Sequence, residues 1–226
     1  SGVDYTYDGA GRLTSAALDG ETATYSYNPN SSCADPNAGA DTNRMDVTTT
    51  PTGGNPATTS SCYNGADQLI STTNPNGYTF TGYTYDTHGN EITDKNGGYS
   101  YTYNASDQLI GESSPTGPVT YTRDPLDRLL TRTQGTTTTT YAYSGYTDTP
   151  SATLGGPLGL AQQLLSLPGG VTATIQSAGN VWSYPDLQGN NIATANDSGN
   201  QTGSPVAYDP WGVQITTGTL NSNING

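Results

Sequence analysis

The sequence is poor in charge, and above all in positive charge. Only 11% of its 226 residues are charged, and six Lys and Arg stand against 19 Asp and Glu. A typical protein has about 25% charged residues. The net charge of −13 leaves no generous basic surface for phosphates, so we expect no nucleic acid partner.

Residues for acid–base, thiol and metal chemistry are equally scarce. His88 is the single histidine, which excludes most designs that pair a tuned imidazole with a second base. No serine lies in a nucleophile-elbow pattern, and two cysteines with one histidine do not form a recognisable zinc site. Asp35, Asp41 and Asp46 are the least implausible calcium ligands, although solvated loop acids are the stronger expectation. We therefore expect no enzyme, no cofactor and no metal.

Long apolar runs are also missing. No stretch approaches the 18 or so apolar residues of a membrane span, and no signal peptide is visible. The chain begins inside a repeat, with Ser1-Gly2-Val3-Asp4-Tyr5, so we take it to be a piece of a longer polypeptide.

What the chain has is tyrosine, threonine and turn formers. It contains 17 Tyr, 29 Gly and 14 Pro, while only 31% of its residues are hydrophobic with Tyr included. Disordered chains are poor in aromatics and rich in charge, and this chain is the opposite. Tyrosine buries a large ring and threonine favours strands, so the composition predicts an ordered all-β chain with a thin tyrosine core and no long helices.

A short motif recurs seven times in the first 143 residues: aromatic, small or polar residue, Tyr or Arg, and usually Asp or Asn before a turn. Most copies start 18 to 22 residues apart, which is typical of a repeat architecture. The copies are Tyr5-Thr6-Tyr7-Asp8, Tyr25-Ser26-Tyr27-Asn28, Ser61-Cys62-Tyr63-Asn64, Tyr83-Thr84-Tyr85-Asp86, Tyr101-Thr102-Tyr103-Asn104, Tyr121-Thr122-Arg123-Asp124 and Tyr141-Ala142-Tyr143-Ser144.

Each repeat reads as one β-hairpin. Alternation places Tyr101 and Tyr103 on one face of a strand and Thr102 on the other, and a second strand follows the turn. The Asp or Asn after the motif is expected to cap the turn, and Gly11 and Gly89 suit a positive φ. If hairpins pair edge to edge, the tyrosines of successive units form cross-strand aromatic ladders.

Two segments interrupt the rhythm. The insertion 28–60 is rich in turn formers and contains a strand-like segment, 43–47, which predicts a decorated surface hairpin. The segment 146–181 contains six of the fifteen leucines; within it, 160–165 could form one helical turn, a plug against the sheet or a plain buried strand. The predicted organisation is thus 1–145 hairpins with the insertion 28–60, a divergent segment 146–181, and further hairpins over 182–226.

Cys33 and Cys62 are the only cysteines, and both lie around the insertion. We favour a disulfide between them, worth about 3 to 4 kcal/mol in the chain-entropy model. Two unconnected small thiols are the alternative.

The motifs Tyr5-Thr6-Tyr7-Asp8-Gly9-Ala10-Gly11 and Tyr83-Thr84-Tyr85-Asp86-Thr87-His88-Gly89 resemble YD repeats, the units of bacterial Rhs proteins, toxin-complex C subunits and teneurins. Two later stretches, Tyr184-Pro185-Asp186-Leu187-Gln188-Gly189-Asn190 and Tyr208-Asp209-Pro210-Trp211-Gly212, are similar to the Rhs-associated core. The resemblance implies antiparallel hairpins in a curved or spiralling sheet, part of a shell that encloses or presents a toxin or other C-terminal domain.

The resemblance also implies a secreted or cell-surface location, and partners in the rest of the same polypeptide or in further copies through sheet edges. The self-cleaving aspartyl protease segment common in Rhs cores is not expected, since no second Asp-Pro-x-Gly follows Asp209. Asp186 and Asp209 are a candidate dyad, but turn capping explains both more simply.

Two other functions remain open. Exposed tyrosines could form a carbohydrate-binding or adhesion module with a glycan partner, and free edges could build a filament. In the scaffold hypothesis the repeat itself supplies the structural residues, which are Tyr5, Tyr7, Asp8, Tyr25, Tyr27, Tyr83, Tyr85, Asp86, Tyr101, Tyr103, Tyr121, Asp124, Tyr141, Tyr143, Tyr184, Asp186, Tyr208 and Asp209.

Overall fold

The structure is a computed structural model, and it describes residues 4–18, 20–94, 96, 98–155, 159–215 and 220. The first three residues, Leu158 of the leucine-rich segment and the closing run 221–226 lie outside these described residues. The chain divides into two compact units, Ser1–Gly117 and Pro118–Gly226, which are described separately. This division leaves the three-part organisation of the sequence analysis untested.

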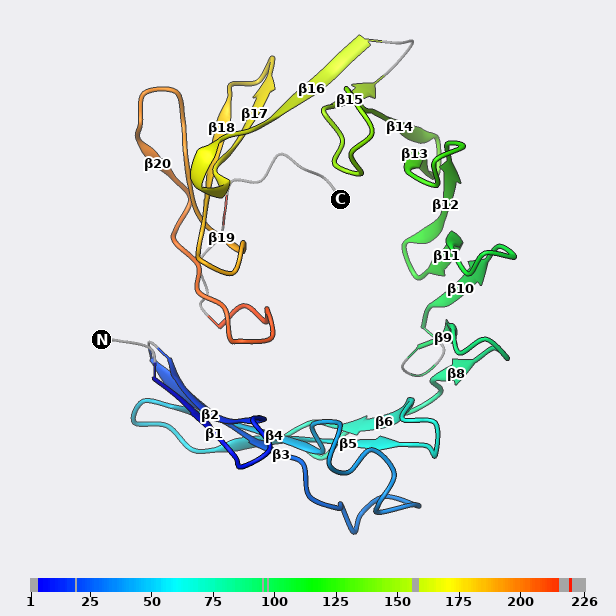
Figure 1. The fold of residues 1–226 in the computed structure, drawn as a ribbon, viewed down its shortest axis with the longest axis vertical. Coiled ribbons are helices and arrows are strands. Elements are labelled where there is room, and N and C mark those ends of the chain that lie inside the picture. Colours follow the sequence, from blue (N-terminus) through cyan, green and yellow to red (C-terminus); the bar gives the residue numbers. More distant parts are fainter. Residues whose placement is uncertain are drawn as a thin grey trace. The chain divides into compact units, whose positions relative to one another are not determined.

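The first unit is built from antiparallel strands that follow one another in chain order (Figure 1). The first seven, β1 to β7, form one sheet. The next four, β8 to β11, also pair antiparallel in chain order. The strands are β1 (Asp4–Tyr7), β2 (Leu13–Leu18), β3 (Glu21–Ser26), β4 (Asp46–Pro51), β5 (Ala57–Tyr63), β6 (Leu69–Thr73), β7 (Thr79–Phe80), β8 (Thr84–Tyr85), β9 (Glu91–Thr93), β10 (Ser100–Tyr103) and β11 (Leu109–Ser114).

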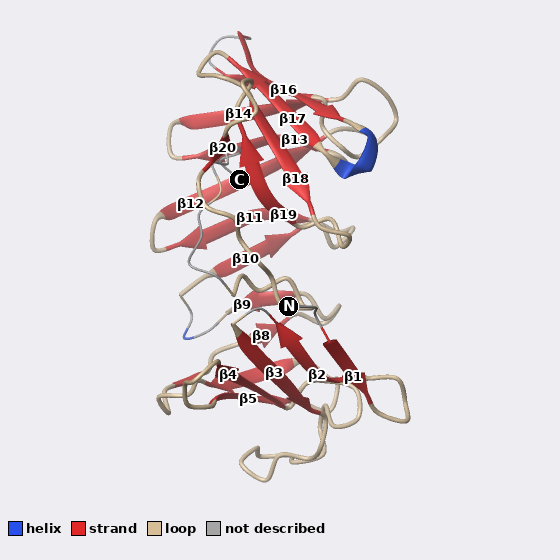
Figure 2. Ribbon diagram, turned by 90° about the vertical axis from the view of Figure 1, so that its left-hand side faces the viewer, coloured by secondary structure: helices blue, strands red, loops and turns tan. Residues whose placement is uncertain are grey.

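The second unit repeats this plan. Each strand pairs antiparallel with the next one in sequence. The helical element among the described residues of this unit is one short turn, η2 (Pro168–Gly170), drawn in blue in Figure 2. The strands are β12 (Gly117–Arg123), β13 (Leu129–Gln134), β14 (Thr137–Ala142), β15 (Ala152–Gly155), β16 (Gly159–Ser166), β17 (Thr172–Gln176), β18 (Val181–Pro185), β19 (Asn191–Ala195) and β20 (Gln201–Thr202). The all-β fold of antiparallel hairpins is therefore confirmed. Among the described residues no helix is long and apolar enough to cross a membrane.

The two faces of the strands carry different side chains. In β10, Tyr101 and Tyr103 are half-buried and Thr102 is exposed, as period-two alternation requires. Six pairs of threonines that face each other across neighbouring strands are joined by hydrogen bonds of 2.6 to 3.0 Å between their hydroxyls. These pairs are Thr48–Thr58, Thr73–Thr79, Thr84–Thr93, Thr122–Thr131, Thr133–Thr138 and Thr194–Thr202.

The predicted ladder of tyrosines on adjacent strands is wrong, because motif tyrosines do not lie opposite one another. A strand of another kind lies between successive tyrosine strands, because every hairpin contributes one strand with the motif and one without it. The residues opposite Tyr5, Tyr25, Tyr101, Tyr121, Tyr141 and Tyr184 are Ala16, Val47, Glu112, Arg132, Thr153 and Ala193.

The predicted tyrosine core is present in the first unit only in part. Tyr25 and Tyr27 are buried in one cluster with Leu13, Ala16 and Ala23, against which Leu18 and Val47 pack. In the described part of the second unit no tyrosine belongs to the buried set. That set consists of Val119, Ala173, Thr174, Val181, Ser183, Thr194, Ala195, Val206 and Asp209.

The insertion contains the predicted decorated hairpin, since 46–60 contributes to a regular hairpin of β4 and β5. The strand-like segment 43–47 is not a strand of its own, because β4 begins at Asp46. The remaining loop, 28–45, is the decoration. In the leucine-rich segment 160–165 belongs to β16, so the helical turn is wrong, and the expected burial is wrong as well because Leu160 is 64% exposed.

Candidate functional site: the repeated turn

The feature that recurs throughout both units is a four-bond turn, seen clearly at Asp86. Its backbone N–H donates to the carbonyl of Asn90 (2.9 Å), and the N–H of Gly89 donates to the carbonyl of Asp86 (3.2 Å). One carboxylate oxygen of Asp86 accepts the N–H groups of His88 (2.8 Å) and Asn90 (3.0 Å). Gly89 has φ of 92° and makes the bulge that such three-residue hairpin loops require. The side chain thus closes the turn over its own backbone.

Eight turns of the described residues share this pattern, four in each unit. In each, the Oδ1 atom of the first residue accepts N–H groups two and four positions later, and the fourth residue has a positive φ. The first residues are Asp8, Asn64, Asp86, Asn104, Asp124, Asp186, Asn196 and Asp209. The five aspartates assigned to the repeat are all in this role.

In six of these turns the fifth side chain also bonds to the first, and the two are chemically matched. Where the first residue is Asp, the fifth is a donor, Arg or Asn; where it is Asn, the fifth is Gln, whose amide oxygen accepts. The pairs are Asp8–Arg12 (2.6 Å), Asn64–Gln68 (2.7 Å), Asp86–Asn90 (3.0 Å), Asn104–Gln108 (2.9 Å), Asp124–Arg128 (2.8 Å) and Asp186–Asn190 (3.0 Å). In each of these six turns the first and fifth side chains are thus bonded to each other.

The charges of these turns follow from the same bonds. The N–H group and side chain of Arg12 lower the pKa of Asp8, and the side chains of Asn90, Arg128 and Asn190 lower those of Asp86, Asp124 and Asp186. These carboxyls are therefore held ionised as hydrogen-bond acceptors, which is the opposite of the raised pKa that a general acid needs.

Tyrosines of the motif fasten one hairpin to the next. The Tyr27 hydroxyl donates to the carbonyl of Leu13 (3.0 Å), the first residue after the preceding turn. Equivalent bonds join Tyr85 to Leu69 (2.8 Å) and Tyr143 to Leu129 (2.7 Å). Burial raises the pKa of all three phenols, so they remain neutral donors.

Two arginines extend this contact to a distant loop. Arg12 lies over the ring of Tyr27 (4.7 Å to its centroid) and donates to the carbonyl of Asp41 (2.8 Å). In the second unit Arg128 lies over Tyr143 (4.2 Å) and donates to the carbonyl of Gly145 (2.6 Å). In both places the turn expected after the tyrosine is replaced by a long loop, 28–45 or 144–151. Arginine at the fifth turn position thus holds an irregular loop in both units.

The remaining repeat tyrosines occupy less uniform positions. Tyr83 and Tyr101 are half-buried, with hydroxyls near Thr72 (3.5 Å) and Asp94 (3.4 Å), and burial raises the pKa of Tyr101 to about 12. Tyr103, Tyr121, Tyr141 and Tyr208 are also half-buried, while Tyr5, Tyr7 and Tyr184 are exposed. Their assignment as structural residues remains a prediction.

The Cys33–Cys62 disulfide is present, with the Cα atoms 5.5 Å apart. It joins loop 28–45 to strand β5, and Cys33, Ala38 and Met45 of this loop are buried. The alternative of two unconnected thiols is therefore excluded in this structure.

The other chemical candidates have ordinary roles. Asp186 and Asp209 each cap a turn, as turn capping predicts. His88 is a turn residue whose Nδ1 lies 2.7 Å from a carboxylate oxygen of Asp107. Among the described residues no three His, Cys, Asp or Glu side chains are grouped to hold a metal ion. Of the three candidate calcium ligands, Asp35 accepts from the Asn37 N–H and Asp41 accepts from the Arg12 guanidinium. Asp46 accepts from the Ser60 hydroxyl.

Sequence reasoning missed the fifth turn position. The signal was present, since the residue four places after each predicted cap is Arg, Gln or Asn in six turns. It also missed the turn that begins at Asn196, where no tyrosine motif precedes.

Sequence comparison identifies the repeat. A family model described as the RHS repeat matches residues 63–100 and 103–139, which contain the turns at Asn64, Asp86, Asn104 and Asp124. These two segments are therefore similar to the RHS repeat. No curated protein matches it.

Solved structures similar to the chain include a mutant Tc holotoxin pore of Photorhabdus luminescens, with 12% identity, a TM-score of 0.46 and 94% of this chain covered. The crystal structure titled TcdB2-TccC3-TEV is 13% identical over 94% of this chain, with a TM-score of 0.36. The chain spans 15% and 16% of the lengths of these two chains.

Proposed function

We propose that the chain is a non-enzymatic structural scaffold, a segment of an RHS-repeat wall that encloses or presents another domain, such as a toxin, of the same polypeptide. The observation that carries this proposal is the set of eight turns with one hydrogen-bonding pattern. Polar groups that chemistry would need are bonded within the turns instead. Repeated hairpins of this kind build surface area, since each contacts mainly its neighbours.

Edge pairing supports the role of a segment in a larger wall. Strand β1 ends the order of the seven-stranded sheet, and Tyr7 at this edge is 59% exposed. Tyr27, the corresponding residue of the next copy, is 7% exposed because the preceding hairpin covers it. We infer that more repeats of the same polypeptide, or of a further copy, pair with this edge.

A secreted or cell-surface location fits the disulfide. Such bonds persist in oxidising compartments and are rare in the cytosol. Fractionation of the producing cells tests this location: the chain should be recovered from the medium or the surface with its thiols blocked. Recovery from the cytosol with both thiols free contradicts it.

Protease protection tests the enclosing role. The polypeptide that contains these repeats is expressed whole, and the digestion of its non-repeat domain by proteinase K is compared with that of the same domain expressed alone. Enclosure predicts slower digestion in the whole polypeptide, and urea at a concentration that unfolds the repeats should abolish the difference. Equal digestion rates before unfolding would overturn enclosure.

A further inference from the structure

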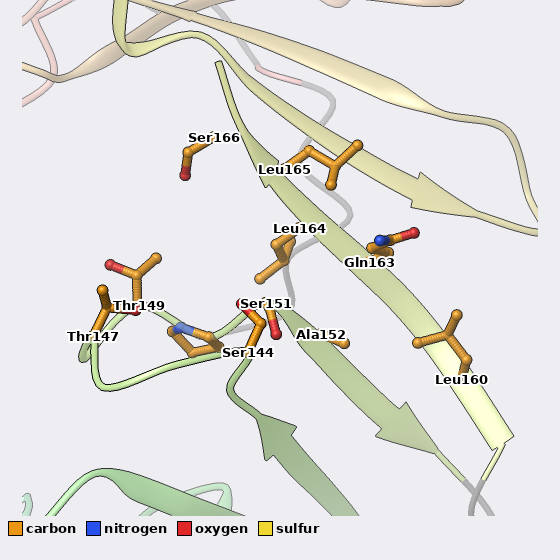
Figure 3. A pocket seen from close by; sticks show the side chains of 11 residues that line it. Ser144, Thr147, Thr149, Ser151, Ala152, Leu160, Gln163, Leu164, Leu165 and Ser166 are labelled. Carbon is orange, nitrogen blue, oxygen red and sulfur yellow. The ribbon is translucent and has the colours of Figure 1, made fainter. Parts of the chain in front are cut away.

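The second unit contains a pocket that the scaffold role does not use. It has a volume of about 520 Å³ and lies between loop 144–151 and strand β16 (Figure 3). Figure 3 shows Leu164 projecting from β16 toward the loop, with Thr147 and Thr149 on the loop. The volume is within the range of small-molecule sites, about 300 to 1,000 Å³.

The lining of this pocket carries no charged side chain. It consists of hydroxyl groups, one glutamine amide and aliphatic groups, the latter mainly from Leu160, Leu164 and Leu165. A neighbouring pocket of about 510 Å³ is different, because Arg123, Asp127, Arg128 and Asp148 line it. An ionic ligand would have no counter-charge in the first pocket, so its chemistry favours an uncharged ligand.

The hydroxyls of this pocket are not paired with one another, unlike several threonine pairs on the strands, such as Thr133 and Thr138 (2.9 Å). Within the described part of the chain, the side-chain oxygens of Ser144, Thr147, Thr149 and Ser166 have no hydrogen-bond partner. Several free hydroxyls that can each donate and accept therefore gather at one opening.

The backbone adds a further polar group. The N–H of Leu164 donates to the carbonyl of Ser151 (2.8 Å) on the β15 side, whereas the N–H of Leu167 donates to Val171 (2.8 Å) on the β17 side. Because backbone groups alternate along a strand, those of Ser166 face the side where β15 has ended. Ala152 opposite Gln163 marks that end, and loop 144–151 lies beyond it.

The loop wall is held in place by Arg128. Its guanidinium donates to the carbonyls of Gly145 (2.6 Å) and Thr147 (3.4 Å), while its other side bonds to Asp124. The bond to Thr147 uses the backbone and leaves the hydroxyl available. Fixing a loop in advance lowers the entropy cost of binding a ligand.

We propose that this pocket binds a neutral oligosaccharide. Sugar hydroxyls can donate to and accept from the free Ser and Thr oxygens, and the C–H groups of a sugar ring can pack on Leu164 and Leu160. This binding site is independent of the enclosing role, since it needs only the second unit's own loop and strand.

Titration of the purified, isotope-labelled chain with chitotriose, cellotriose and maltotriose tests the proposal by NMR. We expect at least one of them to shift the amide signals of 144–151 and 164–166 with a Kd of about 1 mM or tighter. Absence of such shifts for all three overturns the proposal. Tighter binding at these residues by trigalacturonate, or by a neutral Ser/Thr-rich peptide, also overturns it, in favour of an anion site or a peptide site.

Isosteric variants assign the site. Thr147→Val and Thr149→Val remove hydroxyls only, and each should weaken binding of the best trisaccharide about fivefold. Thr137→Val, on an exposed position of β14 outside the pocket, is the matched control and should leave the Kd unchanged. Circular dichroism checks that all variants are folded. Unchanged affinity in both pocket variants, or an equal loss in the control, contradicts the assignment.

Discussion

Loops 28–45 and 144–151 replace the same turn of the repeat, yet they are fixed in different ways. The first is held by Arg12 at Asp41 and by the Cys33–Cys62 disulfide, and it buries three of its own side chains. The second is held by Arg128, is exposed over 144–149 and borders two pockets. One loop has therefore become part of the core, whereas the other keeps its hydroxyls accessible.

The largest effect should come from the covalent link of the first loop. Replacing both cysteines, Cys33→Ser with Cys62→Ser, should lower the free energy of unfolding by about 3 to 4 kcal/mol, because the bridge closes a loop of 29 residues. Urea unfolding of the variant and of the reduced wild type measures it, and the two should agree. Unchanged stability in both would show that Arg12 alone fixes the loop.

The turns that precede the two loops differ at their fourth residue, Gly11 in one and Asp127 in the other, with φ of 79° and 64°. Gly11→Ala should cost about 1 to 2 kcal/mol, since alanine is strained at this φ although no atom lies near its added Cβ. Gly9→Ala in the same turn, also in open space and without a positive φ, is the control and should be nearly neutral. An equal loss in both variants would refute the conformational explanation.

Arg128 should matter more for its loop than Arg12 does, because only loop 28–45 is also held by a disulfide. We expect Arg128→Met to raise the rate of limited proteolysis within 144–151 about tenfold, as charge-assisted hydrogen bonds are lost. Arg12→Met should change cleavage of 28–45 less while the disulfide is intact, and by a similar factor after reduction. Equal effects with the disulfide intact would contradict the comparison.

Regular turns offer a smaller test of the matched side chains. Asn104→Asp removes the amide that donates to Gln108 and should cost about 0.5 to 1 kcal/mol. Adding Gln108→Asn recreates the Asp–Asn pair found at Asp86 and should recover most of that loss in a double-mutant cycle. Additive losses would mean that the pairing is incidental.

The smallest effect concerns His88, which links two regular turns through Asp107. Its hydrogen bond and charge interaction with Asp107 raise the pKa of His88 above 6.5, so the stabilisation is present below pH 6.5 and is lost as pH rises through the folded value. Both side chains are about half exposed, which keeps the contribution small. Thermal unfolding of the wild type and of His88→Gln between pH 5 and pH 9 should converge at the alkaline end.

Local patterns made much of this molecule predictable. Alternation of tyrosine and threonine placed β10, and the chemistry of Asp and Gly placed the turns at Asp8 and Asp86, because each depends on a few adjacent residues. Partners far apart in sequence were not foreseeable: Arg128 meets Gly145, and Arg12 meets Asp41, only after the hairpins pair. The leucines of β16 suggested burial, but their exposure depends on which elements cover that strand.

The matched pairs within the turns have an evolutionary consequence. The side chains of Asp186 and Asn190 bond only within their own turn, so the turn can be duplicated or deleted without removing a side-chain partner from a neighbouring hairpin. Recombination between copies therefore costs little stability at the place where two hairpins are newly joined. The number of hairpins in such a chain can change during evolution by one whole hairpin at a time.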